Sequence, residues 1–257
     1  MATLRVFRWS EGGDAIDGNK PSRSGERFDD FAVTAGPETT VLDALVEAQR
    51  ARDSTLAFRY ACRVGMCGSC AMVVNGRERW ACRTRLASLD TRIVGSTAAR
   101  SNVVVTVRPL YHLPLIRDLV VDMAPFHARM ASLGGALQPA EQAPDYAIVS
   151  RDSRERRDID KSIECIGCAM CVSACTMVAH VEGFPGPAAL NRAFTLQLDR
   201  RDAAKDERWA ALLGDDALSR CHGQGNCTEV CPMEIAPTTS ILRLRRMATR
   251  RLFGRVG

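Results

Sequence analysis

The chain has 257 residues, 46% hydrophobic and 25% charged, a balance typical of a folded globular protein with room for one large domain or two ordinary ones. No stretch approaches the roughly 20 apolar residues that a membrane-spanning helix needs, and no signal peptide follows Met1. We therefore expect a reducing, cytoplasmic compartment, where cysteine groups hold metals more often than they form disulfides. The count of 11 cysteines is odd, which also argues against complete disulfide pairing.

Arginines near the C-terminus supply much of the net charge of +5. They are Arg243, Arg245, Arg246, Arg250, Arg251 and Arg255. Such a run either covers a solvated helix face or meets nucleic acid, anionic lipid or an acidic partner. No zinc-finger or RRM signature accompanies it, so an anionic membrane surface or a partner subunit is favoured over nucleic acid.

Residues 1–108 show a mixed pattern of strands and one helix. Strands are expected at residues 4–9, 28–34, 72–75 and 103–107, the first of which alternates like an edge strand. The helix is predicted over residues 41–51, where apolar residues recur at helical spacing and Thr39 or Thr40 can cap the N-terminus. A few strands around one helix, followed by a cysteine loop, is the plan of a plant-type ferredoxin.

Helical patterns dominate after Pro109 and Pro114, which mark a connector. Helices are expected at residues 116–123, 163–180, 188–197, 209–213 and 238–252. Residues 134–158 are polar and loop-like, and a charged run covers residues 151–160. The predicted fold class is therefore α+β, with one domain over residues 1–108 and an all-α domain over residues 109–257.

The first group of cysteines has the spacing C-x4-C-x2-C with a distant fourth member. Its members are Cys62, Cys67, Cys70 and Cys82. This spacing is the plant-type [2Fe–2S] signature, and Gly65 and Gly68 give the loop the freedom to curl around two irons. A four-cysteine zinc site is the alternative, although such sites usually combine two C-x2-C pairs and only one is present in this group.

The other two groups follow the run C-x2-C-x2-C-x3-C of bacterial ferredoxins, the second of them incompletely. The complete group is Cys165, Cys168, Cys171 and Cys175, and the incomplete one is Cys221, Cys227 and Cys231 with Pro232 after it. Gln224 stands where the pattern has a cysteine. Two related runs predict two clusters, one of them short of a thiolate.

In two-cluster ferredoxins the fourth cysteine of each run binds the other cluster. Applied to both runs, this rule gives a [4Fe–4S] cluster held by Cys165, Cys168, Cys171 and Cys231. Cys175, Cys221 and Cys227 then hold the second cluster. With only three thiolates, that cluster can lose one iron and become [3Fe–4S].

Gln224 has two interpretations. The first is a neighbour that packs over a three-iron cluster, and the second is a four-iron cluster whose fourth iron carries an oxygen ligand or water. Ligand softness favours the first, because amides are poor partners for iron in these clusters. Fewer thiolates also bring less negative charge and a higher reduction potential, so this cluster is expected to accept electrons near the end of a chain.

With these groups in place, the sequence resembles the iron–sulfur subunit of succinate dehydrogenase and fumarate reductase, respiratory complex II. The segments that carry the resemblance are CRVGMCGSC at 62–70, RPL at 108–110, LIRDLVVD at 115–122, CIGC at 165–168, GP at 186–187, CH at 221–222 and CTEVCP at 227–232. The resemblance covers nearly the whole chain. It implies a β-grasp [2Fe–2S] domain over residues 1–108 and a helical, bacterial-ferredoxin-like domain with [4Fe–4S] and [3Fe–4S] clusters over residues 109–257.

The resemblance also implies a relay and its partners. A flavoprotein subunit with FAD oxidises succinate, and electrons pass through the three clusters to quinone at a membrane-anchor subunit of the cytochrome b type, often with haem b. The chain itself then carries no catalytic residue. It is expected as a peripheral protein on the cytoplasmic face of the inner membrane of a prokaryote, with residues 116–118 toward the flavoprotein.

Three residues are candidates for the vicinity of the quinone, namely His222, His180 and Thr176. His222 follows Cys221 as in the family, although an ordinary hydrogen bond is an equally open role for it. Ubiquinone-linked members have a proline after the cysteine that matches Cys175, and tryptophans a few residues on. Here Thr176 follows, and no tryptophan occurs between Cys175 and Trp209. Menaquinone is therefore favoured over ubiquinone.

Two other functions stay open at this point. One is a zinc-containing, non-catalytic protein that binds nucleic acid, against which the complete ferredoxin run counts. The other is the iron–sulfur subunit of another flavin dehydrogenase, whose known examples generally lack the group Cys62–Cys82. The direction of the reaction is open as well, since quinol:fumarate reductase uses the same relay in reverse.

Overall fold

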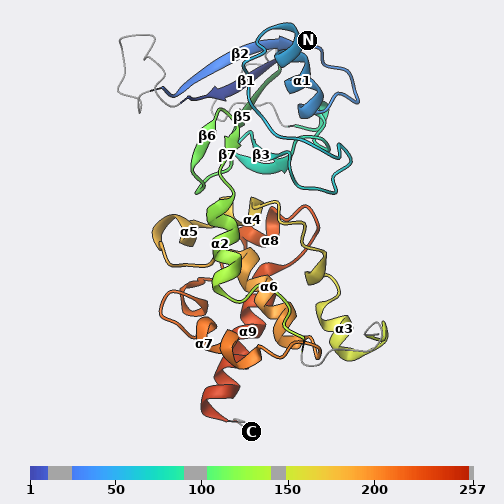
Figure 1. The fold of residues 1–257 in the computed structure, drawn as a ribbon. Coiled ribbons are helices and arrows are strands. Elements are labelled where there is room, and N and C mark those ends of the chain that lie inside the picture. The colour runs from blue at the N-terminus through green and yellow to red at the C-terminus, as the bar shows by residue number, and fades with distance from the viewer. Residues whose placement is uncertain (11–24, 90–102, 140–148, 255–257) are drawn as a thin grey trace. The chain divides into compact units, whose positions relative to one another are not determined.

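The computed structural model describes residues 1–10, 25–89, 103–139 and 149–254, which fall into two units, Met1–Asp122 and Met123–Gly257 (Figure 1). Arg255 of the predicted basic tail lies outside the described residues. The expected domain boundary is at 108/109, whereas the units divide after Asp122. The reason is that the connector bonds back onto the first unit, where the Asp118 N–H donates to the Trp9 carbonyl at 2.9 Å.

A five-stranded sheet forms the first unit, in the order β2-β1-β5-β3-β4. The strands are β1 (Ala2–Arg8), β2 (Arg27–Val33), β3 (Ala71–Val74), β4 (Arg77–Trp80) and β5 (Val103–Arg108). β1 is antiparallel to β2 and parallel to β5, so it lies inside the sheet and the expected edge position is wrong. Alternating side chains indicate the two faces of a sheet, whereas the ladder bonds lie in its plane, so the pattern cannot tell an edge strand from an inner one.

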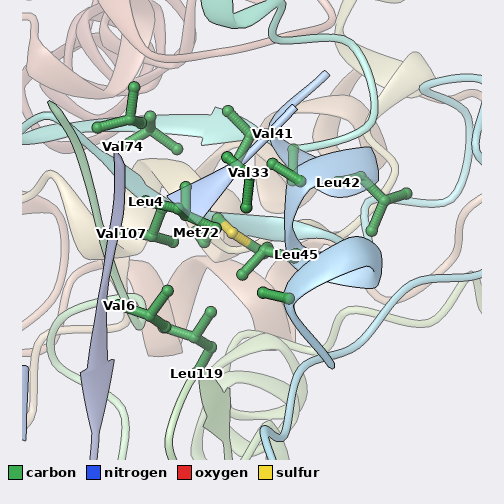
Figure 2. Packing of buried hydrophobic residues seen from close by; sticks show 14 of the residues in the cluster. Leu4, Val6, Val33, Val41, Leu42, Leu45, Met72, Val74, Val107 and Leu119 are labelled. Carbon is green, nitrogen blue, oxygen red and sulfur yellow. The ribbon is translucent and has the colours of Figure 1, made fainter. Parts of the chain in front are cut away.

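Helix α1 (Val41–Ala51) covers one side of this sheet and has the predicted bounds. Thr40 is the N-cap, and its side chain and that of Asp43 form a reciprocal capping box. The apolar face of α1 packs on side chains from the strands, and Figure 2 shows Leu45 beside Met72 in this core. The short 3-10 turn η1 (Leu86–Ser88) follows β4. The core therefore fixes both ends of the loop that carries the first cysteine group.

Residues 115–121 form a hairpin of β6 (Leu115–Arg117) and β7 (Val120–Val121), and the predicted helix over 116–123 is wrong. Asp118 sits in the turn with a left-handed φ of 46°. Its buried carboxylate accepts from Arg8 Nε at 3.0 Å and from the Ala57 N–H at 2.9 Å. A short apolar run suits a strand or a helix equally, and these distant contacts decide for the strand.

Apart from an isolated β-bridge between Pro139 and Asp202, the regular structure in the described part of the second unit is helical. Its helices are α2 (Ala124–Ser132), α3 (Arg154–Ile159), α4 (Met170–Ser173), α5 (Thr176–His180), α6 (Gly186–Leu198), α7 (Lys205–Leu212), α8 (Asn226–Glu229) and α9 (Pro237–Phe253), with 3-10 turns η2 (Ser162–Glu164) and η3 (Leu218–Arg220). The expected helices over 188–197 and 238–252 are confirmed as α6 and α9. The charged run expected as a loop contains α3, which the Ser153 side chain caps.

The single helix expected over residues 163–180 is wrong, because the chain breaks twice there. Ala169 takes a left-handed φ of 62°, and Cys175 is extended. α6 and α9 pack against each other at the centre of the unit, with Phe194 and Ile241 buried. In the described ranges, no helix is both long and apolar enough to cross a membrane.

Candidate functional site

The first cysteine group lies in the loop between α1 and β3 and just after β4. Backbone N–H groups of Val64, Met66 and Cys67 point at Cys62 Sγ, at N···S distances of 3.5, 3.3 and 3.4 Å. The loop curls tightly because Gly65 has a left-handed φ of 79°. A Cβ on Gly65 would lie 3.0 Å from Arg83 Cγ, so glycine is needed for both shape and space.

Thiols in this loop have strongly different acidities. Hydrogen bonds, the largest from the Ser69 side chain, lower the pKa of Cys67 to about 6, and the backbone contributes as well. Burial raises the pKa of Cys70 to about 12, and the neighbouring Cys82 adds to the rise. Donors that stabilise a thiolate prepare a sulfur for a metal, while the buried thiols must release protons when a metal binds.

Three cysteines of the second group and one of the third gather around one pocket in the second unit, with an empty volume of about 410 Å³. Four cysteines line it, namely Cys165, Cys168, Cys171 and Cys231. The first three come from the segment around the start of α4, and Cys231 follows α8. Burial raises the pKa of Cys168 to about 12, and charge repulsion from Cys165 and Cys231 adds to this rise. The contribution of Cys231 reflects its nearness in space, although it is far away in the sequence.

A second pocket, with an empty volume of about 370 Å³, is lined by Cys175, Cys221 and Cys227. Burial raises the pKa of Cys227, and Cys175 and Cys221 both contribute to the rise. Gln224 and His222 line the same pocket. The structure thus brings Cys175 together with the later run and Cys231 with the earlier one.

The two runs reach their pockets by the same local device. A left-handed residue precedes a one-turn helix in each case, Ala169 with φ 62° before α4 and Gly225 with φ 88° before α8. The Asn226 side chain joins the two runs by donating to the Ala174 carbonyl at 3.2 Å. The last cysteine of each run lies in the pocket of the other run.

The donor chemistry of all three groups fits iron–sulfur clusters. Thiolates are soft ligands of the kind that select such clusters or zinc. A single zinc ion needs ligands that converge on one point, and no three His, Cys, Asp or Glu side chains among the described residues converge in that way. A cluster of several irons needs the wider cage that a thiol-lined pocket provides.

The three candidates for the quinone vicinity are placed differently. His222 lines the three-thiol pocket and is exposed. Thr176, also exposed, donates its hydroxyl to Gln224 Oε1 at 2.5 Å and so holds the side chain that replaces the missing cysteine. His180 is exposed at the end of α5 and is not among the residues that line the pocket.

Residues beyond the predicted set also support the three-thiol pocket. Arg245 donates to the carbonyls of Leu218, Ser219 and Cys221, at 3.1 Å and 2.8 Å for the first two. Thr238 Oγ1 lies 3.3 Å from Cys227 Sγ. The sequence signals neither contact, because α9 meets these segments only in the folded unit.

Several arginines of the predicted basic tail are engaged inside the second unit. Arg243 pairs with Asp158 at 3.1 Å, Arg251 pairs with Asp206 at 2.8 Å, and Arg245 binds the carbonyls described above. Arg246 and Arg250 are exposed on α9. A structural role therefore accounts for part of the charge run.

Two family models match the chain. Residues 3–128 match a 2Fe-2S iron-sulfur cluster binding domain, and residues 161–235 match a 4Fe-4S dicluster domain. Both matches describe ferredoxin-type domains, so they decide against the zinc-containing, nucleic-acid-binding alternative.

Related proteins cover the chain almost completely. It is 34% identical over 253 residues to the succinate dehydrogenase iron-sulfur subunit of Paracoccus denitrificans, covering 97% of this chain and 88% of the relative. It is 31% identical over 250 residues to the mitochondrial succinate dehydrogenase (ubiquinone) iron-sulfur subunit of Candida glabrata, covering 96% and 90%. A solved chain of the Mycobacterium smegmatis Sdh1 complex in the apo form has a TM-score of 0.81 at 27% identity, covering 100% of this chain and 98% of that one. The chain therefore belongs to the family of succinate dehydrogenase iron–sulfur subunits.

Proposed function

We propose that this chain is the electron-transfer subunit of a succinate:quinone oxidoreductase. It relays single electrons from the FAD of a partner flavoprotein to quinone at a membrane-anchor subunit of the cytochrome b type. The clusters supply one-electron redox couples when bound. Oxidation of the dicarboxylate takes place on the flavoprotein, so this chain holds, spaces and tunes the redox centres.

The proposal assigns every cysteine as a ligand. Cys62, Cys67, Cys70 and Cys82 hold [2Fe–2S] in an N-terminal β-grasp domain. Cys165, Cys168, Cys171 and Cys231 hold [4Fe–4S], and Cys175, Cys221 and Cys227 hold [3Fe–4S], in a C-terminal helical ferredoxin domain. The observation that carries the proposal is the exchange of Cys175 and Cys231 between the two thiol-lined pockets, because a two-cluster ferredoxin needs that exchange.

The three-thiol site is proposed as the last acceptor on the chain. A cluster with fewer thiolates carries less negative charge and is easier to reduce. Gln224 is assigned as a neighbour and not as a ligand. In support, its amide oxygen already accepts the Thr176 hydroxyl at 2.5 Å, and amides bind the iron of such clusters poorly.

Quinone is proposed to bind near this site, with His222 and Thr176 in its vicinity and His180 farther along α5. The exposure of His222 beside the pocket supports this placement, because a proton carrier must reach both the quinone and water. Menaquinone is the proposed acceptor, since Thr176 stands where ubiquinone-linked members have proline.

The proposed location is the cytoplasmic face of the inner membrane of a prokaryote. There the chain sits peripherally on its anchor, and Arg246 and Arg250 meet anionic headgroups. Basic residues near an anionic surface contribute about 1 kcal/mol each, so this contact supplements the anchor and does not replace it. Fumarate reduction by the same relay is the reverse direction, and cluster potentials and quinone type decide between the two.

Purification from native membranes tests the proposal. A flavoprotein, an anchor subunit and bound menaquinone should accompany the chain, and the air-oxidised complex should show an electron paramagnetic signal of [3Fe–4S]. A diamagnetic four-iron cluster in its place would contradict the three-ligand assignment. A colourless preparation that contains zinc would contradict the relay itself.

A further inference from the structure

Two threonine hydroxyls connect α8 and α9 beside the buried Cys227. Thr228 lies in α8 and Thr238 is the second residue of α9, and both are half-buried. Thr238 Oγ1 lies 3.3 Å from Cys227 Sγ and 3.1 Å from Thr228 Oγ1. The Thr238 backbone N–H lies 3.3 Å from Thr228 Oγ1. The two hydroxyls therefore form a short chain that ends at the sulfur.

The direction of this chain follows from the backbone. An amide N–H can only donate, so Thr228 Oγ1 accepts from it and keeps its single proton for another acceptor. That acceptor is Thr238 Oγ1, which in turn keeps its own proton for Cys227 Sγ. A metal-bound thiolate has no proton and can only accept. Every donor in the chain thus points toward Cys227.

We propose that Thr238 is a positioning residue that donates an O–H···S hydrogen bond to the Cys227 thiolate and thereby raises the reduction potential of the three-thiol site. This inference rests on the proposed function, in which Cys227 is a cluster ligand. Reduction adds one electron and hence negative charge at the irons and their sulfurs. A donor aimed at a sulfur stabilises that charge, and hydrogen bonds to sulfur are among the factors that set cluster potentials.

Thr228 acts one step further from the sulfur. Consecutive hydrogen bonds polarise one another, so a hydroxyl that accepts one bond is a better donor in the next. Removing Thr228 is therefore expected to weaken the bond from Thr238 without abolishing it. The two threonines should shift the potential in the same direction but by different amounts.

The test uses the complete complex purified from membranes, with a redox titration of the [3Fe–4S] paramagnetic signal. Thr238→Val removes the hydroxyl at similar size, Thr238→Ser keeps it, and Thr239→Val makes the same change at the exposed neighbour. We expect Thr238→Val to shift the redox equilibrium roughly three- to tenfold toward the oxidised form, where tenfold is 59 mV for one electron. Thr238→Ser and Thr239→Val should stay near the native potential.

Pulsed paramagnetic resonance after exchange into deuterated water gives an independent measurement. Backbone N–H groups of Met177 and Val178 beside Cys175 also exchange, so the test is a difference between variants: the native complex and Thr238→Ser should show one exchangeable-deuteron coupling that Thr238→Val lacks. An unchanged potential and coupling in Thr238→Val would overturn the inference. If that variant assembles no cluster, Thr228→Val takes its place, and an unchanged potential there would overturn it equally. A native complex without any three-iron signal would instead contradict the proposed function.

Discussion

Asp118 provides a quantitative test of what holds the first unit together. Its carboxylate is 3% exposed and accepts three hydrogen bonds, from Arg8 Nε at 3.0 Å and from the backbone N–H groups of Trp9 at 3.0 Å and Ala57 at 2.9 Å. Asp118→Asn keeps the shape and tolerates the left-handed backbone of the turn. The substitution removes the negative charge. It also replaces one accepting oxygen by an NH2 group, which then faces one of the three donors without an acceptor between them.

The cost follows from these contacts. A lost hydrogen bond to a charged group costs about 1.5–3 kcal/mol, and a buried donor left without an acceptor costs about 1–3 kcal/mol. Arg8 keeps Asp29 and Asp53 as partners at 3.0 and 2.5 Å, so the full penalty of an unpaired buried charge does not apply. We expect Asp118→Asn to lower the free energy of unfolding by about 3 kcal/mol, out of a typical total of about 5–15 kcal/mol.

Urea unfolding, followed by the visible absorbance of the [2Fe–2S] cluster, measures this loss of stability. With a urea dependence of about 1–3 kcal/mol per molar, the midpoint should fall by roughly 1–3 M. Asp30→Asn is the matched control, because Asp30 pairs with Arg5 at 2.8 Å on an exposed surface and should change stability by less than about 1 kcal/mol. Equal midpoints for the two variants would refute the role given to Asp118.

Three further results are expected. Cys231→Ser should remove the [4Fe–4S] signal and leave the three-iron signal, and Cys175→Ser should do the reverse; loss of the same cluster in both would contradict the exchange. Gly65→Ala should lower retention of [2Fe–2S] more than Gly76→Ala does. The two glycines have similar φ, 79° and 77°, but only at Gly65 would a Cβ be crowded, with Arg83 Cγ at 3.0 Å. Equal losses of the cluster would assign the cost to backbone strain alone. The Thr55 hydroxyl and Arg8 lower the pKa of Asp53, so its ionised carboxylate contributes stability above about pH 4, and this stability is lost as the pH falls further. Asp53→Asn should therefore reduce the difference between the urea midpoints at about pH 5 and about pH 3. An unchanged difference would contradict that assignment.

Local signals made some elements predictable. α1 begins and ends as expected, because its cap at Thr40 and its apolar face are written within 12 consecutive residues. The hairpin at residues 115–121 was not predictable in the same way. Its turn depends on Arg8, which is 110 residues away, and on the Ala57 N–H. Apolar periodicity reports local geometry and carries no information on such partners.

In the candidate site, too, local features were predictable from the sequence and contacts between distant segments were not. The spacing of the cysteines suggested which thiols meet, because ligand spacing is itself a local property, and the structure brings those thiols to two pockets. Their roles as ligands remain predictions. The contacts of Thr238 and Arg245 with the three-thiol pocket were not predictable from the sequence, because a threonine or arginine on a helix gives no sign of which segment it will face.

On the proposed ligand assignment, the surroundings of the two pockets favour the same order of cluster potentials as the ligand count. Apolar groups dominate the wall of the four-thiol pocket, among them Phe126, Ile166, Pro232 and Ile235. Low polarity disfavours the more highly charged reduced state, which lowers a potential. The three-thiol pocket also has apolar walls, including Phe184 and Ile241, but His222, Gln224, Asn226 and Thr238 line it as well, and their dipoles can stabilise added negative charge. Gln224 is held by Thr176 at the position where the ferredoxin run has a cysteine. On the proposed ligand assignment, its polar amide would replace a charged ligand, so ligand count and surroundings would together make the cluster in this pocket the easier one to reduce.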